Sequence, residues 1–172
     1  RIGSLNNDAE LKGNEVIGDP TEGALIVSAE KKGLSREQLG AEYKRIDEIE
    51  FTSERKMMAT IHQYKKQKIS DVKGAPEVVL AHCDFALVNG KAKKLSLNDK
   101  KEILKVNREF AGNALRVIGF AFRDFKDKNS AEKNLVFVGL QAMIDPPREE
   151  VKPAIEKCNK AGIKVIMITG DH

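Results

Sequence analysis

Residues 56–80, KMMATIHQYKKQKISDVKGAPEVVL, contain the pattern that decides the fold. From Met57 to His62, alternate residues form two rows, which is the period of a β-strand. A turn rich in lysine and glutamine then leads to a second strand at Ile69–Lys73, and Gly74–Glu77 opens a short helix. Strand, tight turn and strand predict antiparallel pairing, so we expect two or three strands of a meander followed by a helix.

The segment Gly18–Gly33, GDPTEGALIVSAEKKG, predicts a helix on the N-terminal side of the meander. Asp19 is a favoured N-cap residue, and Pro20 suits the first helical position. Glu22 stands where a capping box requires its acidic member. Gly33 is a natural C-terminal stop.

The C-terminal side of the meander continues the same mixture of strands and helices. An Asn-Gly pair at 89–90 favours a two-residue hairpin turn, and Ser96 with Asp99 three residues later caps a helix. The further expected elements are a hairpin at 85–94, a helix at 96–112, and strands at Leu115–Phe122 and Leu135–Met143. Hairpins and helices therefore follow one another along this part of the chain.

The pattern changes after Ile144. The sequence DPPR at 145–148 cannot continue a sheet ladder, because proline lacks the N–H donor. A helix with an apolar face at 151–158 follows, and then a nearly all-apolar strand at Ile163–Ile168. Strand, crossover helix and apolar strand form the start of a parallel α/β unit. We therefore expect a domain of residues 1–143 and a short α/β fragment of residues 144–172.

The composition suits a globular domain with a real core. The chain has 172 residues, of which 41% are hydrophobic and 33% are charged. No apolar run approaches the roughly 18 residues that would span a bilayer, and no secretion leader opens the chain. Cys83 and Cys158 fit no metal or redox spacing, which predicts reduced, cytosolic cysteines. Because the chain begins at Arg1 rather than Met, we expect a segment cut out of a larger protein.

The net charge of +4 raises the question of an anionic partner. Lysine runs at 65–68 and 91–94 would suit such a partner, and they would equally suit solvated hairpin turns. Aromatic residues make up 5% of the chain, tryptophan is absent, and no aromatic platform accompanies the basic runs. These features count against binding of single-stranded nucleic acid, so we favour the solvated turns and expect no nucleic-acid partner.

Several places in the sequence could hold a phosphorylated nucleotide. Lys73 ends a strand just before a helix N-terminus, where a point charge and free N–H groups suit a phosphate. In FTSERKMM, Phe51 could take an adenine on its ring while Lys56 holds phosphates. Each has a structural alternative, namely a solvent-exposed lysine and a core phenylalanine beside surface cations.

Two further positions, and the end of the chain, carry groups of the same kind. The Glu22 carboxylate could accept from the adenine amino group, although its capping role is enough to explain it. Arg116 could hold a phosphate in two-point geometry, or form a surface ion pair. Thr169, Gly170 and Asp171 would follow a parallel strand with a hydroxyl, a flexible backbone and a carboxylate, which suits a phosphoryl group. There is no P-loop motif, and the histidines are too scattered in the sequence to suggest a metal site.

Six stretches, in this order, resemble the cytoplasmic part of the P-type cation-transporting ATPases. The similarity is greatest to the calcium-type pumps and their bacterial and archaeal relatives, and it extends over nearly the whole chain. The stretches are GDPTEGAL, FTSERKMM, VKGAPE, ALRVIGFA, MIDPPR and VIMITGD.

The resemblance implies an architecture and a function. Residues 1–143 would be the nucleotide-binding domain, an α+β fold in which helices flank an antiparallel sheet. Residues 144–172 would be the returning part of a phosphorylation domain of haloacid-dehalogenase-like α/β fold. In such a pump, ATP with Mg²⁺ transfers its γ-phosphoryl group to an aspartate, which couples hydrolysis to transport of a cation, calcium being favoured. This part would lie on the cytoplasmic side of the membrane. Its partners would be the rest of the phosphorylation domain, the actuator domain and the transmembrane domain.

The resemblance also assigns the adenine end of the site. Phe51 would stack on the adenine with Met58 beside it. Glu22 would meet the adenine end, with Thr21 adjacent. Ser53 stands where many calcium pumps carry a basic residue, which puts one phosphate contact in doubt.

The phosphate end is assigned in the same way. Lys56 and Lys73 would line the nucleotide pocket, and Arg116 would reach the phosphates. Gly74 and Ala75 would let the ligand approach closely. The remaining assignments are an interdomain hinge at Asp145 and Arg148, and contacts with the transferred phosphoryl group from Thr169, Gly170 and Asp171.

The chain also departs from the family pattern. The Asp-Lys-Thr-Gly-Thr stretch with the phosphorylated aspartate, the later Asp-rich magnesium site and the Thr-Gly-Glu of the actuator are all missing from the sequence. We therefore expect an excised fragment that binds ATP without hydrolysing it, most Mg²⁺ ligands lying elsewhere. A free-standing haloacid-dehalogenase-like phosphatase would need an Asp-x-Asp nucleophile, which the sequence lacks. The apolar strand at the end would be mobile or would pair with a second copy.

Overall fold

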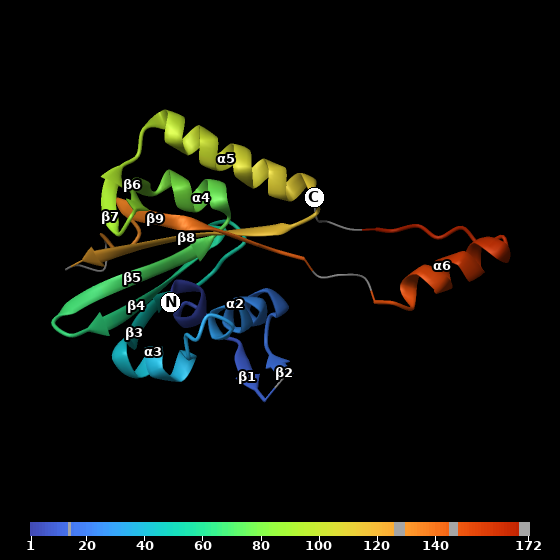
Figure 1. Ribbon diagram of the computed structural model, residues 1–172, viewed down its shortest axis with the longest axis horizontal. Coiled ribbons are helices and arrows are strands. Elements are labelled where there is room, and N and C mark those ends of the chain that lie inside the picture. The colour runs from blue at the N-terminus through green and yellow to red at the C-terminus, as the bar shows by residue number, and fades with distance from the viewer. Residues whose placement is uncertain (14, 126–129, 145–147, 169–172) are drawn as a thin grey trace.

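A seven-stranded sheet forms the centre of the computed structural model, which describes residues 1–13, 15–125, 130–144 and 148–168 (Figure 1). The strand order is β3-β4-β5-β8-β9-β6-β7, and the neighbours are antiparallel except for the parallel pair β6 and β9. The strands are β3 (Lys44–Ile49), β4 (Met57–Tyr64), β5 (Gln67–Gly74), β6 (Cys83–Val88), β7 (Lys91–Lys94), β8 (Arg116–Phe125) and β9 (Leu135–Met143). The predicted antiparallel meander is confirmed as β3, β4 and β5.

Helices cover both faces of this sheet, as the α+β prediction requires (Figure 1). One face carries α4 (Pro76–Ala81) and α5 (Leu97–Gly112). The other face carries α1 (Ile2–Leu5), α2 (Pro20–Glu30) and α3 (Arg36–Glu42), together with a small hairpin of β1 (Glu10–Lys12) and β2 (Glu15–Ile17). The part of the chain that the structure describes contains no helix both long and apolar enough to cross a membrane.

The alternation of β4 separates two buried layers. Met57 and Ala59 point into the main core, which lies under α4 and is formed by Met57, Ala59, Val72, Val79, Leu80, Cys83, Ala121, Leu135 and Phe137. The intervening residues Met58, Thr60 and His62 are also buried. Their face of the sheet carries a smaller apolar cluster of Ile2, Leu25 and Phe120. Several of the buried side chains on this face are polar, among them Thr60, Asp71 and Lys73.

The local start and stop residues act largely as predicted. The Asp19 side chain accepts hydrogen bonds from the backbone of Thr21 and Glu22 and caps α2. Ser96 and Asp99 form the expected capping box of α5. At 89–90, Asn and Gly adopt the positive φ angles, 50° and 75°, that a two-residue hairpin turn requires.

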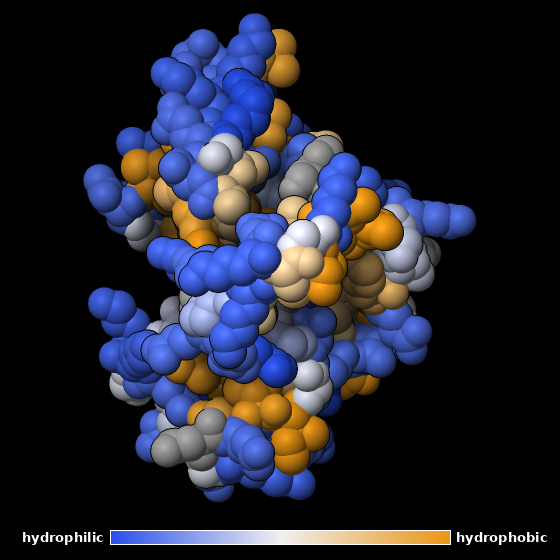
Figure 2. Space-filling view, turned by 90° about the vertical axis from the view of Figure 1, so that its right-hand side faces the viewer, coloured by the Kyte–Doolittle hydropathy of each residue, from blue (hydrophilic) through white to orange (hydrophobic). Residues whose placement is uncertain are grey.

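The C-terminal region agrees with the sequence only in part. The helix expected there is α6 (Val151–Lys160), and it buries no residue. The predicted strand at Ile163–Ile168 is wrong, because these residues belong to no strand and are exposed. A strand needs a neighbouring chain to receive its backbone hydrogen bonds, and no described strand pairs with this segment. Figure 2, which views the molecule from the side of α6, shows hydrophobic residues in patches on this face.

Candidate functional site

The predicted site residues of the meander meet at one end of β4 and β5. Met58 is the direct cross-strand partner of Lys73. Just beyond this pair, the backbone N–H of Ala75 donates to the carbonyl of Lys56 at 2.9 Å. The hairpin therefore brings together five of the predicted residues, Lys56, Met58, Lys73, Gly74 and Ala75.

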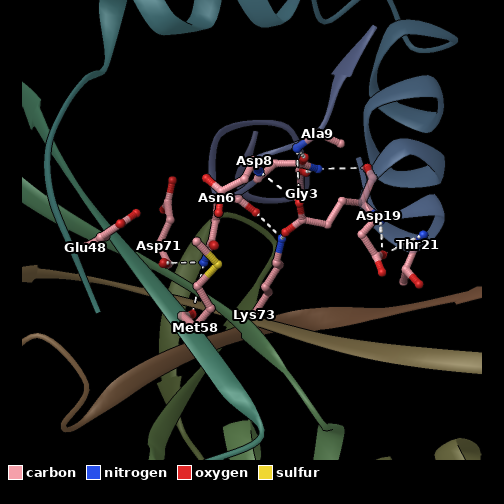
Figure 3. A network of polar contacts seen from close by, with 12 residues as sticks. Gly3, Asn6, Asp8, Ala9, Asp19, Thr21, Glu48, Met58, Asp71 and Lys73 are labelled. Atoms are coloured by element: carbon pink, nitrogen blue, oxygen red, sulfur yellow. Dashed lines mark hydrogen bonds and ion pairs between the residues drawn. The ribbon is translucent and has the colours of Figure 1, made fainter. Parts of the chain in front are cut away.

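Lys73 is buried in this structure, with 9% of its surface exposed. Its Nζ donates to the backbone carbonyl of Asn6 at 2.5 Å (Figure 3). The same Nζ forms an ion pair with the Glu22 carboxylate. Burial lowers the pKa of Lys73, while the hydrogen bond and the charge of Glu22 oppose that shift. The alternative of a solvent-exposed lysine is therefore wrong, and a cation lies inside the protein at the end of the strand pair.

Glu22 completes this buried pair from the first turn of α2. One carboxylate oxygen, Oε1, meets Lys73, and the other, Oε2, accepts from the backbone N–H groups of Asp8 and Ala9 at 2.9 and 3.1 Å. The expected capping box is therefore wrong, because the carboxylate turns toward the N-terminal segment instead of toward the N–H of Asp19. The cap on Asp19 fixes the start of α2 and so the place from which Glu22 reaches Lys73.

The N-terminal segment contributes two buried asparagines that the sequence analysis missed. The side-chain amide of Asn6 donates to the carbonyls of Met58 and Asp71 at 3.1 and 2.7 Å. Asn7 donates to the carbonyl of Glu22 at 2.8 Å. Both asparagines are fully buried. The sequence feature that could have pointed to them is a pair of asparagines directly after the short segment Ile2–Leu5.

The same segment is held from outside by two arginines. Arg36 of α3 donates to the carbonyls of Asn7 and Ala9, and Arg45 of β3 pairs with the Asp8 carboxylate at 2.7 Å. Together with Lys73, three cations therefore contact the short segment Asn6–Ala9. The backbone that receives Lys73 is thus contacted from β5, α3 and β3.

Arg116 and Thr21 are brought together at the same end of the sheet. Nη1 of Arg116, the first residue of β8, donates to the Thr21 hydroxyl at 2.8 Å. Thr21 precedes Glu22 in α2, so this bond connects β8 with the helix that carries the buried pair. Arg116 is exposed, and its guanidinium donates to a hydroxyl group at the same end of the sheet.

Phe51 lies in the loop between β3 and β4, and 57% of its surface is exposed. The alternative of a core phenylalanine is therefore wrong. The loop ends in a turn closed by a hydrogen bond of 2.8 Å from the N–H of Lys56 to the carbonyl of Thr52. An exposed aromatic ring thus stands in the loop that leads to Lys56 and Met58.

The packing of the β4 and β5 backbones explains why position 74 is a glycine. A Cβ atom at this position would lie 2.4 Å from the carbonyl oxygen of Lys56 and 2.6 Å from Cα of Met57. The close approach that glycine permits here is therefore that of the β4 backbone. Approach of a ligand to Gly74 and Ala75 stays a prediction.

The remaining predicted residues lie away from this cluster or outside the described residues. Arg148 is exposed in the segment before α6. The residues outside the described part of the chain are Asp145, Thr169, Gly170 and Asp171. Among the described residues, no group of three or more histidine, cysteine or acidic side chains could hold a metal ion.

A cavity of about 490 Å³ lies elsewhere on the sheet, between α1 and strands β8, β9 and β6. Its lining is mainly apolar and includes Phe120, Phe122 and Leu87, but none of the predicted site residues. The end of the sheet that carries Lys56, Lys73 and Arg116 therefore remains the candidate site on chemical grounds.

These features define a class of protein: an α+β domain whose sheet carries a cluster of cations, one of them buried, at one strand end. The particular family follows from comparison with known proteins. The chain belongs to the family described as P-type ATPase, cytoplasmic domain N, whose family model matches residues 1–150.

Named relatives point in the same direction. The chain is 44% identical to calcium-transporting ATPase 1 of Bacillus cereus and 42% identical to the calcium-transporting ATPase of Bacillus subtilis, over 98% and 97% of its length. It is 41% identical over 99% of its length to the cation-transporting ATPase pma1 of Synechocystis. The chain spans about a fifth of the length of each of these relatives.

Proposed function

We propose that this chain is the ATP-binding part of a P-type ATPase that transports a cation, calcium being favoured by the names of the relatives. The observation that carries the proposal is the convergence of Lys56, Lys73 and Arg116 at one end of the sheet, in a chain of this family. Three cations at one end of a sheet suit the phosphates of a nucleotide.

The adenine would lie on the exposed ring of Phe51, with Met58 beside it. A base stacked on an aromatic ring contributes about 1–3 kcal/mol. Glu22 keeps some capacity to accept from the adenine amino group, because a carboxylate has about four lone-pair positions and three are used. The lysines and Arg116 would then neutralise the phosphates.

Lys73 has one N–H donor left for a ligand. An ammonium group has three N–H donors, and two of them are directed at Asn6 and Glu22. The third would be available to a phosphate. Because Glu22 offsets part of the charge of Lys73, we expect moderate affinity, a Kd of roughly 0.1 to several mM.

Mg²⁺ would arrive with ATP. The cations around Lys73 would suit the polyphosphate, whereas the described part of the chain offers no cluster of carboxylates for a divalent ion. The Mg²⁺ ligands and the phosphorylated aspartate would belong to the rest of the pump. Residues 144–172 would be a piece of the haloacid-dehalogenase-like phosphorylation domain, and Asp145 and Arg148 would lie at the hinge. In the intact pump, Thr169, Gly170 and Asp171 would contact the transferred phosphoryl group.

The chain alone would hold and orient ATP without hydrolysing it. Positioning and charge stabilisation supply most of the catalysis in phosphoryl transfer, and this chain would provide the positioning. The rest of the phosphorylation domain, the actuator domain and the transmembrane domain would be its partners.

An ATP titration followed by amide NMR shifts tests the proposal. We expect shifts around Glu22, Phe51, Lys73 and Arg116, and a Kd at least about fivefold weaker in Phe51→Ala and in Lys73→Met. Lys94→Met, which removes an exposed lysine of β7, serves as the matched control and should leave the Kd unchanged. Shifts confined to the lysines of β7, or no shifts at several mM ATP in a folded protein, would contradict the proposal.

A further inference from the structure

Asn6 occupies a place where its side chain reaches two strands at once. It follows α1 directly, is fully buried, and donates through Nδ2 to the carbonyls of Met58 and Asp71. These carbonyls lie 52 and 65 residues away along the chain. Both amide hydrogens of Asn6 are therefore used to fix this residue against the strand pair β4 and β5.

The two carbonyls belong to the strands that carry Lys73. Met58 is the cross-strand partner of Lys73, and Asp71 precedes Lys73 by two residues on the same strand. A residue attached at these two points is fixed relative to the lysine. Its own backbone carbonyl lies 2.5 Å from Nζ of Lys73, within the distance of a hydrogen bond (Figure 3).

The consequence for Lys73 is a fixed direction for its ammonium group. A lysine has a flexible four-carbon stem, and its three N–H bonds rotate freely when nothing holds them. Here the Asn6 carbonyl and the Glu22 carboxylate hold two of them. The third N–H then has one direction, and a phosphate meets a donor that is already oriented.

The chemistry of the side chain at position 6 is specific. An asparagine provides two donors on a short arm, whereas aspartate provides none and serine provides one. Aspartate would also bury a second carboxylate next to the backbone of Asp71, whose own side chain is buried. Two carbonyl acceptors in a buried place therefore call for a primary amide.

We infer that Asn6 is a positioning residue for nucleotide binding: its side chain clamps β4 to β5 so that its backbone carbonyl orients the Lys73 ammonium toward a phosphate. This inference rests on the proposed function, because it assigns to Asn6 a role that acts through Lys73. Asn6 itself need not touch the ligand.

The test is a double-mutant cycle on the 172-residue chain with ATP as the probe. We expect Asn6→Ala to weaken ATP binding about tenfold, which corresponds to the loss of one hydrogen bond to a charged group. In a Lys73→Met background, Asn6→Ala should change the Kd less than twofold. Thr60→Ala is the matched control, because Thr60 is equally buried on β4 but contacts His62 and not Lys73. It should leave the Kd within twofold of the wild type.

A second measurement uses the wild-type chain, in case Asn6→Ala does not fold. The ¹⁵Nζ signal of Lys73, assigned by its loss in Lys73→Met, should show slow exchange of the ammonium hydrogens with water. An exchange rate like that of the exposed Lys94 would overturn the inference.

The outcomes separate the two proposals. If the wild type does not bind ATP, or Lys73→Met binds as well as the wild type, the proposed function fails. If Lys73→Met weakens binding but Asn6→Ala behaves like Thr60→Ala, or is equally harmful in both backgrounds, only the inference about Asn6 fails.

Discussion

Gly74 lies at the candidate site, and its lack of a Cβ atom lets β5 approach the backbone of β4 closely. A Cβ would collide with the backbone of Lys56 and Met57, which cannot move without shifting β4. We expect Gly74→Ala to lower the free energy of unfolding by about 1–3 kcal/mol, measured by urea denaturation. Gly40→Ala is the control, because Gly40 lies within α3, has open space around it, and should gain up to about 1 kcal/mol from better helix propensity. Equal effects at both positions would refute this account.

Two buried groups beneath α1 make the stability depend on pH in opposite directions. Burial lowers the pKa of His62 from 6.5 to about 4, so the neutral imidazole is favoured. Its contribution to stability is present above pH 6.5 and is lost as the pH falls toward 4. Burial raises the pKa of Asp71 from 3.8 to about 6, although Arg1 opposes this shift. Its contribution is present below pH 3.8 and is lost as the pH rises through 6.

These shifts predict two complementary variants. The two shifts have opposite signs, so in the wild type the two contributions oppose each other between pH 4 and 6. Relative to the wild type, His62→Gln should lose stability as the pH rises from 4 to 6, because only Asp71 then titrates. Asp71→Asn should instead lose stability as the pH falls over the same range. Urea denaturation at half-unit pH steps would show both slopes, and parallel profiles for all three proteins would disprove the assignment.

At the scale of elements, the N-cap of α2 is joined to the candidate site, whereas that of α5 is not. Asp19→Ala and Ser96→Ala each remove a capping side chain and should each lower the free energy of unfolding by about 1 kcal/mol. Only Asp19→Ala should also weaken ATP binding, by about two- to fivefold, because Glu22 and Thr21 lie in the first turn that Asp19 fixes. Thermal melts and ATP titrations of the two variants give the comparison. Equal affinities would show that the start of α2 does not position the pair.

Elements whose cause is local could be predicted from the sequence. The cap at Asp19, the capping box at Ser96 and the Asn-Gly turn are set by neighbours within four residues, and all three are present in the structure. The alternation of β4 likewise predicted its pairing with β5, because only a short turn separates them.

Contacts over long distances in sequence could not be predicted in this way. Lys73 meets Glu22 over 51 residues, and Asn6 meets Asp71 over 65. A local role in the cap of α2 was enough to explain Glu22 in the sequence. In the structure its carboxylate pairs with Lys73 instead, because a buried ammonium group needs a carboxylate more than an exposed helix end does. The predicted strand at Ile163–Ile168 failed for a related reason, since its apolar residues indicate burial but do not supply a neighbour to pair with.

At the scale of the whole molecule, the described chain has two unequal parts. The sheet and its helices, up to Met143, contain the buried residues, including every member of the three apolar clusters. From residue 148 to 168, no described side chain is buried. Partly buried residues continue to Met143, and the division into two domains near this residue stays a prediction.

This division leads to a prediction for a chain shortened to residues 1–144. Since α6 buries no residue, removing it should change the midpoint of thermal unfolding by less than about 2 °C and leave the ATP affinity as it is.

The full chain should associate as its concentration rises, because Val165, Ile166, Met167 and Ile168 expose between 47% and 93% of their surface. Sedimentation velocity would detect this, and the shortened chain should remain monomeric. Ile166→Lys in the full chain should also reduce association, because a charge interrupts the apolar run. If the shortened chain melts several degrees lower while remaining monomeric, the C-terminal segment packs on the sheet in solution, and the self-association that we expect of it is wrong.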